Sequence, residues 1–545
     1  KDQPQTAMRA IKKAVTGRLG IPLLPFVLLV LWTGFFLLVR SPEQSFLAHD
    51  EGYYAQQARW ILANQDWLTV GWWGDVVFDR TIALQGLIAI SYGLFGWSET
   101  AARLPTALAS LGAVLLTWRL GTYFWDGRVG WWGAAILVVT PIWAQASRLA
   151  MQDIVLVFLE LLGIWALLRA EATSRRWGWG LLAGATVGLG FFVKSVMVVL
   201  PVVALMPYLI QRWRFHLTNP GLYGGLVLGF IPPGLWLGLS LQQYGGLPLQ
   251  QLLGKVLRLS QVSQGSGAFY PTTPFFYVWN IPANGFPWVM FAIAGFVLAW
   301  RSPHLRRRWL WLGYPVILLA CLMAFDTRTW YYPLQLYPFL ALFAALALTQ
   351  LTERYGAPTP RQRRLPLALT GMVTGLAVLL LGAGLVLLGA PRWGLDPSLR
   401  PYGWIGIGGG LGWLVPGWVW VQDRNARWQR RGGLWQAGWL FGPALAIAAL
   451  LATGLWGNYS ADVKTTLSRP PLVSILEDPV HFIRPDAGAT AVLLTNYTPH
   501  LGQRFNDLAD LPPGDYAWAP AGELSAGFTS ITAVRDWQLV YRQQP

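Results

Sequence analysis

The sequence has little cysteine, histidine or charge. Its one cysteine, Cys321, lies inside an apolar run, so no disulfide can form within the chain and a disulfide framework is excluded. Charged residues make up only 12% of the 545 positions, against roughly 25% in soluble domains. So low a charge content excludes an ordinary soluble protein.

What the chain has instead is apolar and aromatic surface. Hydrophobic residues make up 54% of the sequence, 33 residues are tryptophan, and the mean hydropathy is +0.41. This composition predicts a polytopic membrane protein. The net charge of +16 does not point to nucleic acid, because Lys and Arg accumulate in the cytoplasmic loops of membrane proteins.

Thirteen apolar runs approach the length of about 20 residues that a membrane-spanning helix needs. They cover residues 21–39, 100–124, 129–147, 153–170, 177–193, 195–211, 221–241, 279–300, 309–325, 330–352, 365–389, 403–421 and 434–456. One more run, 82–97, is ambiguous. If it does not cross, nearly every basic cluster falls on the side of the basic N-terminus, as the positive-inside rule requires. We therefore expect 82–97 to lie along the outer surface.

This topology predicts an uncleaved first span with a cytoplasmic N-terminus, two external loops and an external C-terminal tail. The transmembrane domain is expected to cover 1–457, with external loops at 40–99 and 242–279. Residues 458–545 are rich in Asp, Asn, Thr and Pro and include the strand-like runs 489–495 and 531–541. The predicted fold is thus an all-α polytopic membrane protein with a small α/β soluble C-terminal domain in the periplasm.

Two carboxylates are the strongest candidates for chemistry on the outer side. Asp50 precedes the helix after the first span, and Asp153 begins the fourth span. Asp is also a favoured helix N-cap, so a purely structural role is the alternative for both. Glu160 lies seven residues after Asp153, two helical turns further on the same face. It needs a partner or a water-filled cavity, and an ion pair with an Arg of a neighbouring helix is the structural alternative to a catalytic role.

Cations and tyrosines near the outer side are candidates for binding an anion. Lys194 ends the fifth span, and with Arg80 and Arg258 from the two external loops it offers donors to a phosphate. The alternative for Lys194 is a side chain that reaches the lipid headgroups. Tyr331 and Tyr332 precede the tenth span, where an aromatic belt is the default explanation and phosphate or sugar binding the alternative.

Five motifs in this order resemble those of a known superfamily. They are Asp50-Glu51-Gly52-Tyr53-Tyr54, Arg103-Leu104-Pro105, the SRLAMQD run ending at Asp153, FFVKS around Lys194, and YYPLQLYP from Tyr331. The chain resembles the GT-C superfamily of lipid-linked-sugar glycosyltransferases. Within it the similarity is greatest to the family-39-like bacterial branch that contains aminoarabinose transferase, with protein O-mannosyltransferases more distant.

The resemblance implies an inverting glycosyltransferase that moves a sugar from a polyprenyl-phosphate donor to a lipid or glycan acceptor at the outer face of the bacterial plasma membrane. By position, Asp50 is expected to be the principal catalytic carboxylate and Asp153 a second one in the same cavity. Lys194, Arg80, Arg258, Tyr331 and Tyr332 are expected to bind the donor phosphate. The expected supporting residues are Glu51, Tyr54, Arg103 and Glu160. Membrane lipids, but no nucleic acid, are the other expected partners.

Departures from the family pattern affect the expected cofactors. Related enzymes often read Glu-Lys-Pro-Pro where this chain has Asp79-Arg80-Thr81-Ile82, and some hold a divalent ion with a His of the second external loop. Here the loop 242–279 contains no His. No cofactor is therefore certain, and a divalent metal held by Asp50, Glu51 or Asp79 remains an alternative.

Three other functions compete with this one. A protein O-mannosyltransferase would keep the donor and use a protein Ser or Thr as acceptor. A lipid-linked-sugar transporter or flippase would show paired interrupted helices and internal repeats, and the sequence shows neither. A non-enzymatic scaffold would not need carboxylates and cations gathered around two external loops.

Overall fold

The computed structural model describes residues 22–260, 273, 275–302, 307–325, 327–423, 431–486, 488–522, 524 and 526–544. The chain divides into two compact units. The helical unit contains residues up to Val39, Thr106–Arg148 and Gln152–Leu455. The α/β unit contains Arg40–Pro105, Leu149–Met151 and Trp456–Pro545.

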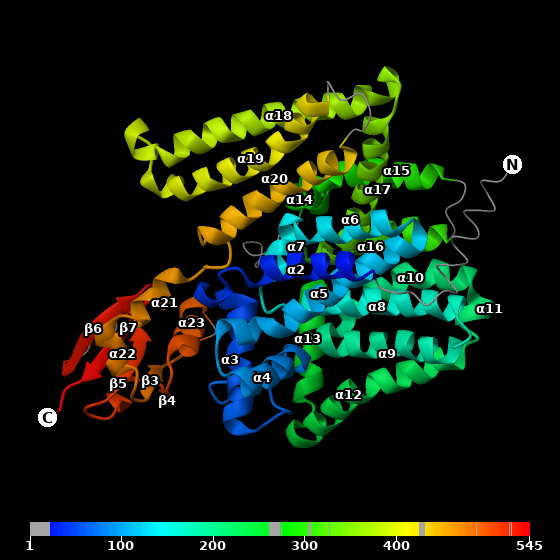
Figure 1. Ribbon diagram of the computed structural model, residues 1–545. Coiled ribbons are helices and arrows are strands. Elements are labelled where there is room, and N and C mark those ends of the chain that lie inside the picture. The colour runs from blue at the N-terminus through cyan, green and yellow to red at the C-terminus, as the bar shows by residue number, and fades with distance from the viewer. Residues whose placement is uncertain are drawn as a thin grey trace. The chain divides into compact units, whose positions relative to one another are not determined.

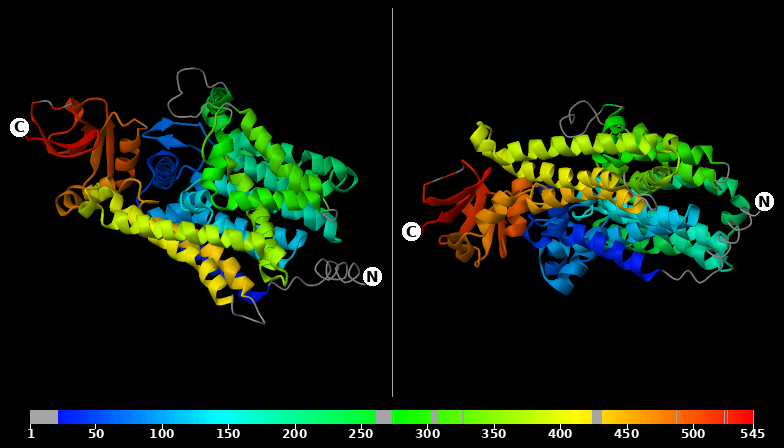
Figure 2. Two further views of the ribbon diagram at one scale, coloured as in Figure 1. Left: turned by 90° about the horizontal axis from the view of Figure 1, so that it is seen from above. Right: turned by 45° about the horizontal axis from the view of Figure 1, so that its top comes forward.

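The helical unit is made of long apolar helices. They are α2 (Leu23–Leu38), the larger part of α5 (Glu99–Phe124), α6 (Gly127–Val138), α7 (Pro141–Ala146), α8 (Gln152–Ala172), α9 (Arg176–Lys194), α10 (Val199–Gln211), α11 (Trp213–His216), α12 (Pro220–Tyr244), α13 (Leu247–Ser260), α14 (Phe276–Asn284), α15 (Trp288–Arg301), α16 (Tyr314–Ala324), α17 (Tyr337–Gly356), α18 (Pro360–Leu388), α19 (Arg400–Asp423) and α20 (Gly432–Ala452). In Figures 1 and 2, α18, α19 and α20 lie side by side as a layer of three.

Each of the thirteen predicted spans is occupied by helix in this unit. By length and hydropathy alone, 8 helices of the described chain are able to cross a membrane, and the bent pair α14 and α15 brings the total up to 9. The remaining predicted spans coincide with helices that are interrupted, shorter or more charged, such as the pair α6 and α7 and the helix α8. The chain is a multi-pass membrane protein, and the predicted fold class is confirmed.

Glycines bring α9 and α12 into close contact along their length. Every fourth residue on the facing surfaces is glycine: Gly180, Gly184 and Gly188 on α9, and Gly221, Gly225 and Gly229 on α12. A Cβ atom at Gly225 would lie 2.0 Å from the backbone oxygen of Leu181. Small residues at this spacing let two backbones approach, which is how helices associate where the hydrophobic effect cannot drive them together.

Ionic contacts at the two ends of α8 agree with the predicted assignment of helix ends to the two sides of the membrane. Asp153 at the start of α8 pairs with Lys194 at the end of α9, so these helices are antiparallel. At the other end Glu171 accepts hydrogen bonds from Arg307 and Tyr208, and His216 Nε2 lies 3.0 Å from its carboxylate. The first pair was expected outside and the second group inside. Residues expected on one side of the membrane thus contact each other.

The α/β unit joins two segments that are far apart in the sequence. From the first come α3 (Tyr53–Asn64), the short strands β1 (Gly71–Trp72) and β2 (Asp75–Val76), and α4 (Ala83–Phe95). From the tail come α21 (Ala461–Leu467), α22 (Pro470–Ile475), β3 (Val480–Ile483), α23 (Ala489–Tyr497), β4 (Leu501–Phe505), β5 (Tyr516–Pro520), β6 (Phe528–Val534) and β7 (Trp537–Arg542). The five tail strands form one sheet in the order β4-β3-β5-β7-β6.

The tail corrects one sequence prediction and refines another. Residues 489–495, read as strand-like, are helical and form most of α23. Seven of its nine residues are buried, and a short run that is apolar on every side does not reveal by its period whether it is helix or strand. The run 531–541 is not one strand but the hairpin of β6 and β7, with Arg535 at positive φ in its turn.

The ambiguous run 82–97 forms α4, which has 13 residues. At 1.5 Å per residue such a helix is about 20 Å long, short of the roughly 30 Å of a bilayer core. Its Leu84, Ile88 and Tyr92 are buried, whereas Leu87 and Ile90 are exposed. A short helix with both buried and exposed apolar residues fits the expected position along the outer membrane surface. That position stays a prediction.

Candidate active site

Asp50 lies in a strained turn rather than at the start of a regular helix. The turn, η2, covers Ala48–Gly52, and α3 begins only at Tyr53. The backbone of Asp50 has φ 62° and ψ −77°, whereas His49 before it is extended. A residue with a side chain in this region carries strain of about 1–3 kcal/mol, which persists only where the surroundings impose it. Holding Asp50 in this backbone conformation therefore costs folding free energy.

Arg80 binds the Asp50 carboxylate. Its Nη1 donates to Asp50 Oδ1 at 2.9 Å and its Nε donates to Asp79 Oδ2 at 3.1 Å. The guanidinium also lies 4.8 Å from the ring centre of Tyr54, whose hydroxyl donates to Asp50 at 3.4 Å. Burial acts to lower the pKa of Arg80, but Tyr54 and the two carboxylates outweigh it and raise that pKa well above its ordinary value. Arg80 is a permanent cation beside Asp50.

The ring centre of Tyr53 lies 5.8 Å from the same guanidinium. Burial, with a contribution from Asp79, raises the pKa of Tyr53 to about 12, so its hydroxyl keeps its proton at physiological pH. The side chain of Asp50 itself is 30% exposed. A half-exposed carboxylate, held by a fixed cation and a tyrosine hydroxyl, is arranged to accept a proton from a bound nucleophile.

Glu51 and Arg103 form a buried ion pair beneath this turn. Arg103 Nε and Nη2 donate to the two oxygens of Glu51 at 2.7 and 3.0 Å, and Nη2 also donates to the carbonyl of Ser45. The backbone N–H groups of Leu47 and Ala150 complete the shell of the carboxylate, which is fully buried. The two predicted supporting residues are thus brought together, and their contacts are structural.

These contacts bear on the expected metal. Both oxygens of Glu51 accept hydrogen bonds from protein donors, which disfavours Glu51 as a metal ligand. Arg80 engages both Asp50 and Asp79, and a cation does not share a site with a second cation at no cost. Over the residues that the structure describes, no three His, Cys, Asp or Glu side chains gather as a metal site would require. The donor set does not fit a metal.

A second cluster of predicted residues lies in the helical unit. Lys194 forms an ion pair with Asp153, and its Nζ lies 5.2 Å from the ring centre of Tyr331 and 5.1 Å from that of Tyr332. Asp153 and Lys194 have side chains exposed by only 7% and 12%. The two tyrosines are held just before α17 by the short helix η5 (Tyr332–Leu336). A lysine with three ammonium donors, framed by two aromatic rings, is suited to a phosphate oxygen.

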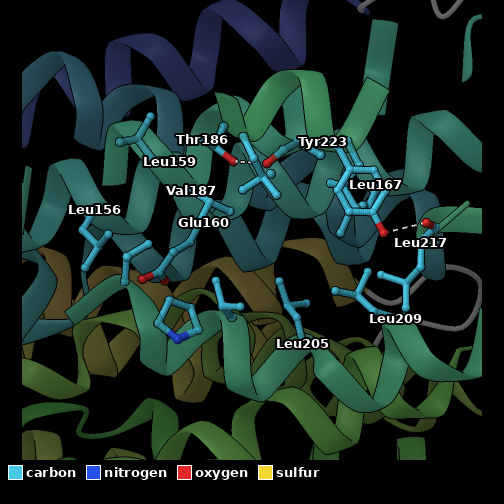
Figure 3. Close-up of a pocket in the computed structure, with 17 residues that line it drawn as sticks. Leu156, Leu159, Glu160, Leu167, Thr186, Val187, Leu205, Leu209, Leu217 and Tyr223 are labelled. Atoms are coloured by element: carbon cyan, nitrogen blue, oxygen red, sulfur yellow. Dashed lines mark hydrogen bonds between the residues drawn. The ribbon is translucent and has the colours of Figure 1, made fainter. Parts of the chain in front are cut away.

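An apolar cavity lies between α8, α9, α10 and α12 (Figure 3). It has a volume of about 200 Å³ and is lined mainly by leucines and valines. Glu160 is the acidic residue in its wall, among Leu156 and Leu159. Its Oε2 accepts a hydrogen bond of 3.5 Å from Tyr314, so the expectation of an arginine partner is wrong. The tyrosine hydroxyl gives one oxygen of this carboxyl group a partner in the apolar wall without bringing a second charge there.

One predicted residue has no side-chain description, and others were missed. Arg258 lies in α13, but its side chain is outside the described part of the chain. Tyr277 and Arg328, both buried, were not among the predicted site residues, and Tyr277 lies within electrostatic range of both Arg328 and Asp153. The tail residues Asn496 and Tyr497 contact the turn of Asp50 from more than 440 residues away in the sequence. No local pattern in a single sequence signals such a contact.

Comparison with known proteins places the chain within a fold. A solved structure of ArnT from Cupriavidus metallidurans bound to undecaprenyl phosphate superposes with a TM-score of 0.74 over 94% of this chain and 97% of that one, at 17% identity. The chain has the GT-C fold. The same enzyme in the apo state gives a TM-score of 0.72 over 96% of this chain.

Sequence comparison covers part of this GT-C chain. A family model described as dolichyl-phosphate-mannose-protein mannosyltransferase matches residues 79–236. An "undecaprenyl phosphate-alpha-4-amino-4-deoxy-L-arabinose arabinosyl transferase 2" of Pseudomonas fluorescens is 32% identical over 207 residues, which are 37% of this chain and 35% of that protein. A transferase of the same name from Pseudomonas aeruginosa is 30% identical over 195 residues. The matched stretch spans about a third of each of these relatives.

Proposed function

We propose that this protein is an integral-membrane glycosyltransferase that moves a sugar from a polyprenyl-phosphate donor to a lipid or glycan acceptor, with inversion at the anomeric carbon. The single observation that carries the proposal is the strained turn that holds Asp50 beside Arg80, a carboxylate and a permanent cation in one place. The GT-C fold and the partial identity to undecaprenyl-phosphate-dependent transferases support the reading.

In this mechanism Asp50 acts as the general base. It takes the proton from the acceptor hydroxyl or amine while that atom attacks the anomeric carbon, and the bond to the phosphate oxygen breaks on the opposite face. A positioned base of this kind contributes about 10²–10⁴-fold to the rate. Arg80, which is hydrogen-bonded to both Asp50 and Asp79, keeps this base in position.

Lys194, Tyr331 and Tyr332 bind the donor phosphate, with Arg258 as a further donor. Asp153, which forms an ion pair with Lys194, serves as the second carboxylate. The apolar cavity between α8, α9, α10 and α12 suits an isoprenoid chain, because its wall offers leucine and valine side chains to the methyl branches.

The proposed location is the bacterial inner membrane, with the N-terminus in the cytoplasm and the C-terminal tail in the periplasm. The distribution of Lys and Arg over the loops supports this orientation. It places the donor-binding end of α8 on the periplasmic side, where a lipid or glycan acceptor is available.

The test supplies purified protein with a radiolabelled polyprenyl-phosphate sugar and a membrane extract. Wild type should transfer label to a lipid or glycan, and Asp50→Asn should lower the rate at least about 100-fold. The matched control is Asp66→Asn, because Asp66 accepts hydrogen bonds from Leu68 and Thr69 in a local turn. Equal rates for wild type and Asp50→Asn would remove Asp50 from the mechanism.

The family model that matches residues 79–236 favours a second candidate, a protein O-mannosyltransferase-like enzyme. The same assay separates the two. Label recovered on protein Ser or Thr rather than in the lipid or glycan fraction would replace the first acceptor class with the second.

A further inference from the structure

Side chains of the C-terminal tail hold the end of the turn that carries Asp50 and the segment just before that turn. Before Asp50, the backbone N–H of Phe46 donates to Tyr497 Oη at 2.8 Å. After it, Asn496 Nδ2 donates to the carbonyl of Gly52 at 2.8 Å. Asn458 adds a third point, because its Oδ1 accepts from both the N–H and the hydroxyl of Ser45 at 3.0 and 2.8 Å.

Two of these contacts come from the end of one helix, α23. Asn496 and Tyr497 are its last two residues. Asn496 is 1% exposed, and its amide also donates to the carbonyl of Val492 in its own helix. Tyr497 in turn donates to Glu99 at 3.1 Å. These hydrogen bonds lie within the α/β unit, and each of the two side chains is held at two points.

The end of α23 is itself held by the segment that follows the turn. Arg59 of α3 donates to the carbonyls of Thr495, Asn496 and Thr498, and also bonds that of Pro499. A cation at a helix C-terminus satisfies carbonyls that have no partner within the helix. Thus α3, which follows the turn, holds the end of α23, and α23 in turn contacts the turn.

There is little space around Gly52, the last residue of the turn. A Cβ atom at this position would lie 3.1 Å from Val492 Cγ1 of α23 and 3.1 Å from the carbonyl of Leu47. The turn therefore fits against α23 with little room to shift. Because Asp50 has a backbone conformation that it would not adopt alone, these outside contacts determine where its carboxylate points.

We propose that Asn496 and Tyr497 are positioning residues for Asp50, and that the C-terminal tail acts in the transfer reaction by fixing the strained turn. This role rests on the proposed function of Asp50. The tail need not touch a substrate for this purpose.

The test compares Asn496→Leu and Tyr497→Phe with Arg535→Ala in the full-length protein. Arg535 forms an ion pair with Asp462 elsewhere in the tail, so its removal perturbs the tail without touching the turn. Tyr497→Phe keeps the ring and removes only the hydroxyl, which guards against a loss of folding. Each variant is checked for its melting temperature in detergent.

Two readouts are measured. The first is deuterium uptake in the peptide that spans residues 45–53, which does not depend on activity. In the two positioning variants we expect uptake at least about 10-fold faster than in wild type, because local opening of the turn becomes easier. In Arg535→Ala the uptake should stay as in wild type.

The second readout is kinetic. We expect kcat to fall about 10–100-fold in the positioning variants with an unchanged KM for the polyprenyl-phosphate sugar, since a small displacement of a reacting group lowers the rate that strongly. A merely structural role would lower the amount of folded enzyme and leave kcat per folded molecule unchanged.

Unchanged uptake in residues 45–53, or the same increase in Arg535→Ala, would overturn the positioning role. So would a kcat per folded molecule equal to that of wild type. If wild type transferred no sugar at all, the proposed function would fail instead, and the uptake comparison would still decide whether the tail fixes the turn.

Discussion

At the scale of single residues, two neighbouring acidic side chains of this protein, Glu51 and Asp50, have different surroundings. Glu51 and Arg103 are adjacent to the candidate site and fully paired, with both Glu51 oxygens bound by protein donors. Asp50, the next residue, keeps a half-exposed carboxylate in a strained turn. Neighbouring acidic residues in one motif therefore have different roles, which only their contacts distinguish.

Lys194 offers the first residue-scale prediction. Lys194→Ala should weaken binding of a polyprenyl-phosphate sugar about 10-fold or more, because a charge-assisted hydrogen bond to phosphate is lost. The measurement is donor affinity by titration of the purified protein. The variant should also unfold more easily, since it leaves Asp153, 7% exposed, without its cation.

Asp153→Asn is the matched comparison for Lys194→Ala. It breaks the same ion pair but leaves the ammonium free, so donor affinity should stay the same or rise while stability again falls. Donor affinity that falls equally in both variants would mean that the pair supports the fold and that Lys194 does not bind the phosphate.

At the scale of elements, close packing of α9 against α12 builds one wall of the apolar cavity. The glycines of the two helices let the backbones approach, and Leu222 and Leu226 of α12 then face Ala183 and Val187 of α9 in the cavity wall. The sequence shows the four-residue glycine spacing, but at many of the described glycines an added Cβ would have no atom within 4 Å. Only the packing of the helices shows which glycines lie against a neighbouring helix.

Gly225→Leu and Gly224→Leu form a pair that tests this contact. A side chain at Gly225 would meet the backbone of Leu181, whereas nothing lies within 4 Å of the Cβ position at Gly224. We expect Gly225→Leu to lower the free energy of unfolding by about 1–3 kcal/mol or more, as overpacking does. Gly224→Leu should leave it almost unchanged. Thermal unfolding in detergent measures both, and equal melting temperatures would contradict the packing.

At the scale of the whole molecule, the contacts at the ends of α8 divide charged residues into two groups, as the positive-inside rule predicts. Asp153 and Lys194 meet at one end, and Glu171, His216 and Arg307 at the other. The orientation of these ends in the membrane follows from the basic loops and stays a prediction.

Single cysteines test this orientation directly. In a Cys321→Ala background, Ser398→Cys in the exposed turn before α19 should react with a membrane-impermeant maleimide in intact spheroplasts. Ser174→Cys, exposed between α8 and α9, should react only after the membrane is permeabilised. Labelling of both, or of Ser174→Cys alone, in intact spheroplasts would contradict the proposed topology.

The sequence alone determined the membrane class, the thirteen helical stretches and the chemistry of the site residues. Hydropathy, helix length and loop charge are local properties, and each can be read within about 20 residues. Local reasoning also grouped Lys194 with Tyr331 and Tyr332, since each precedes or follows an apolar run at the same expected boundary.

Only the tertiary structure decided which of these segments contact each other. The strand-like run 489–495 became the buried helix α23, because a short apolar run fits either form and its burial in the unit selects one. Glu160 received a tyrosine partner, and the tail joined residues 40–105 in one unit. The hydrogen bond from Asn496 to Gly52 closes 444 residues of chain, a separation at which no periodicity or motif carries information about the partner.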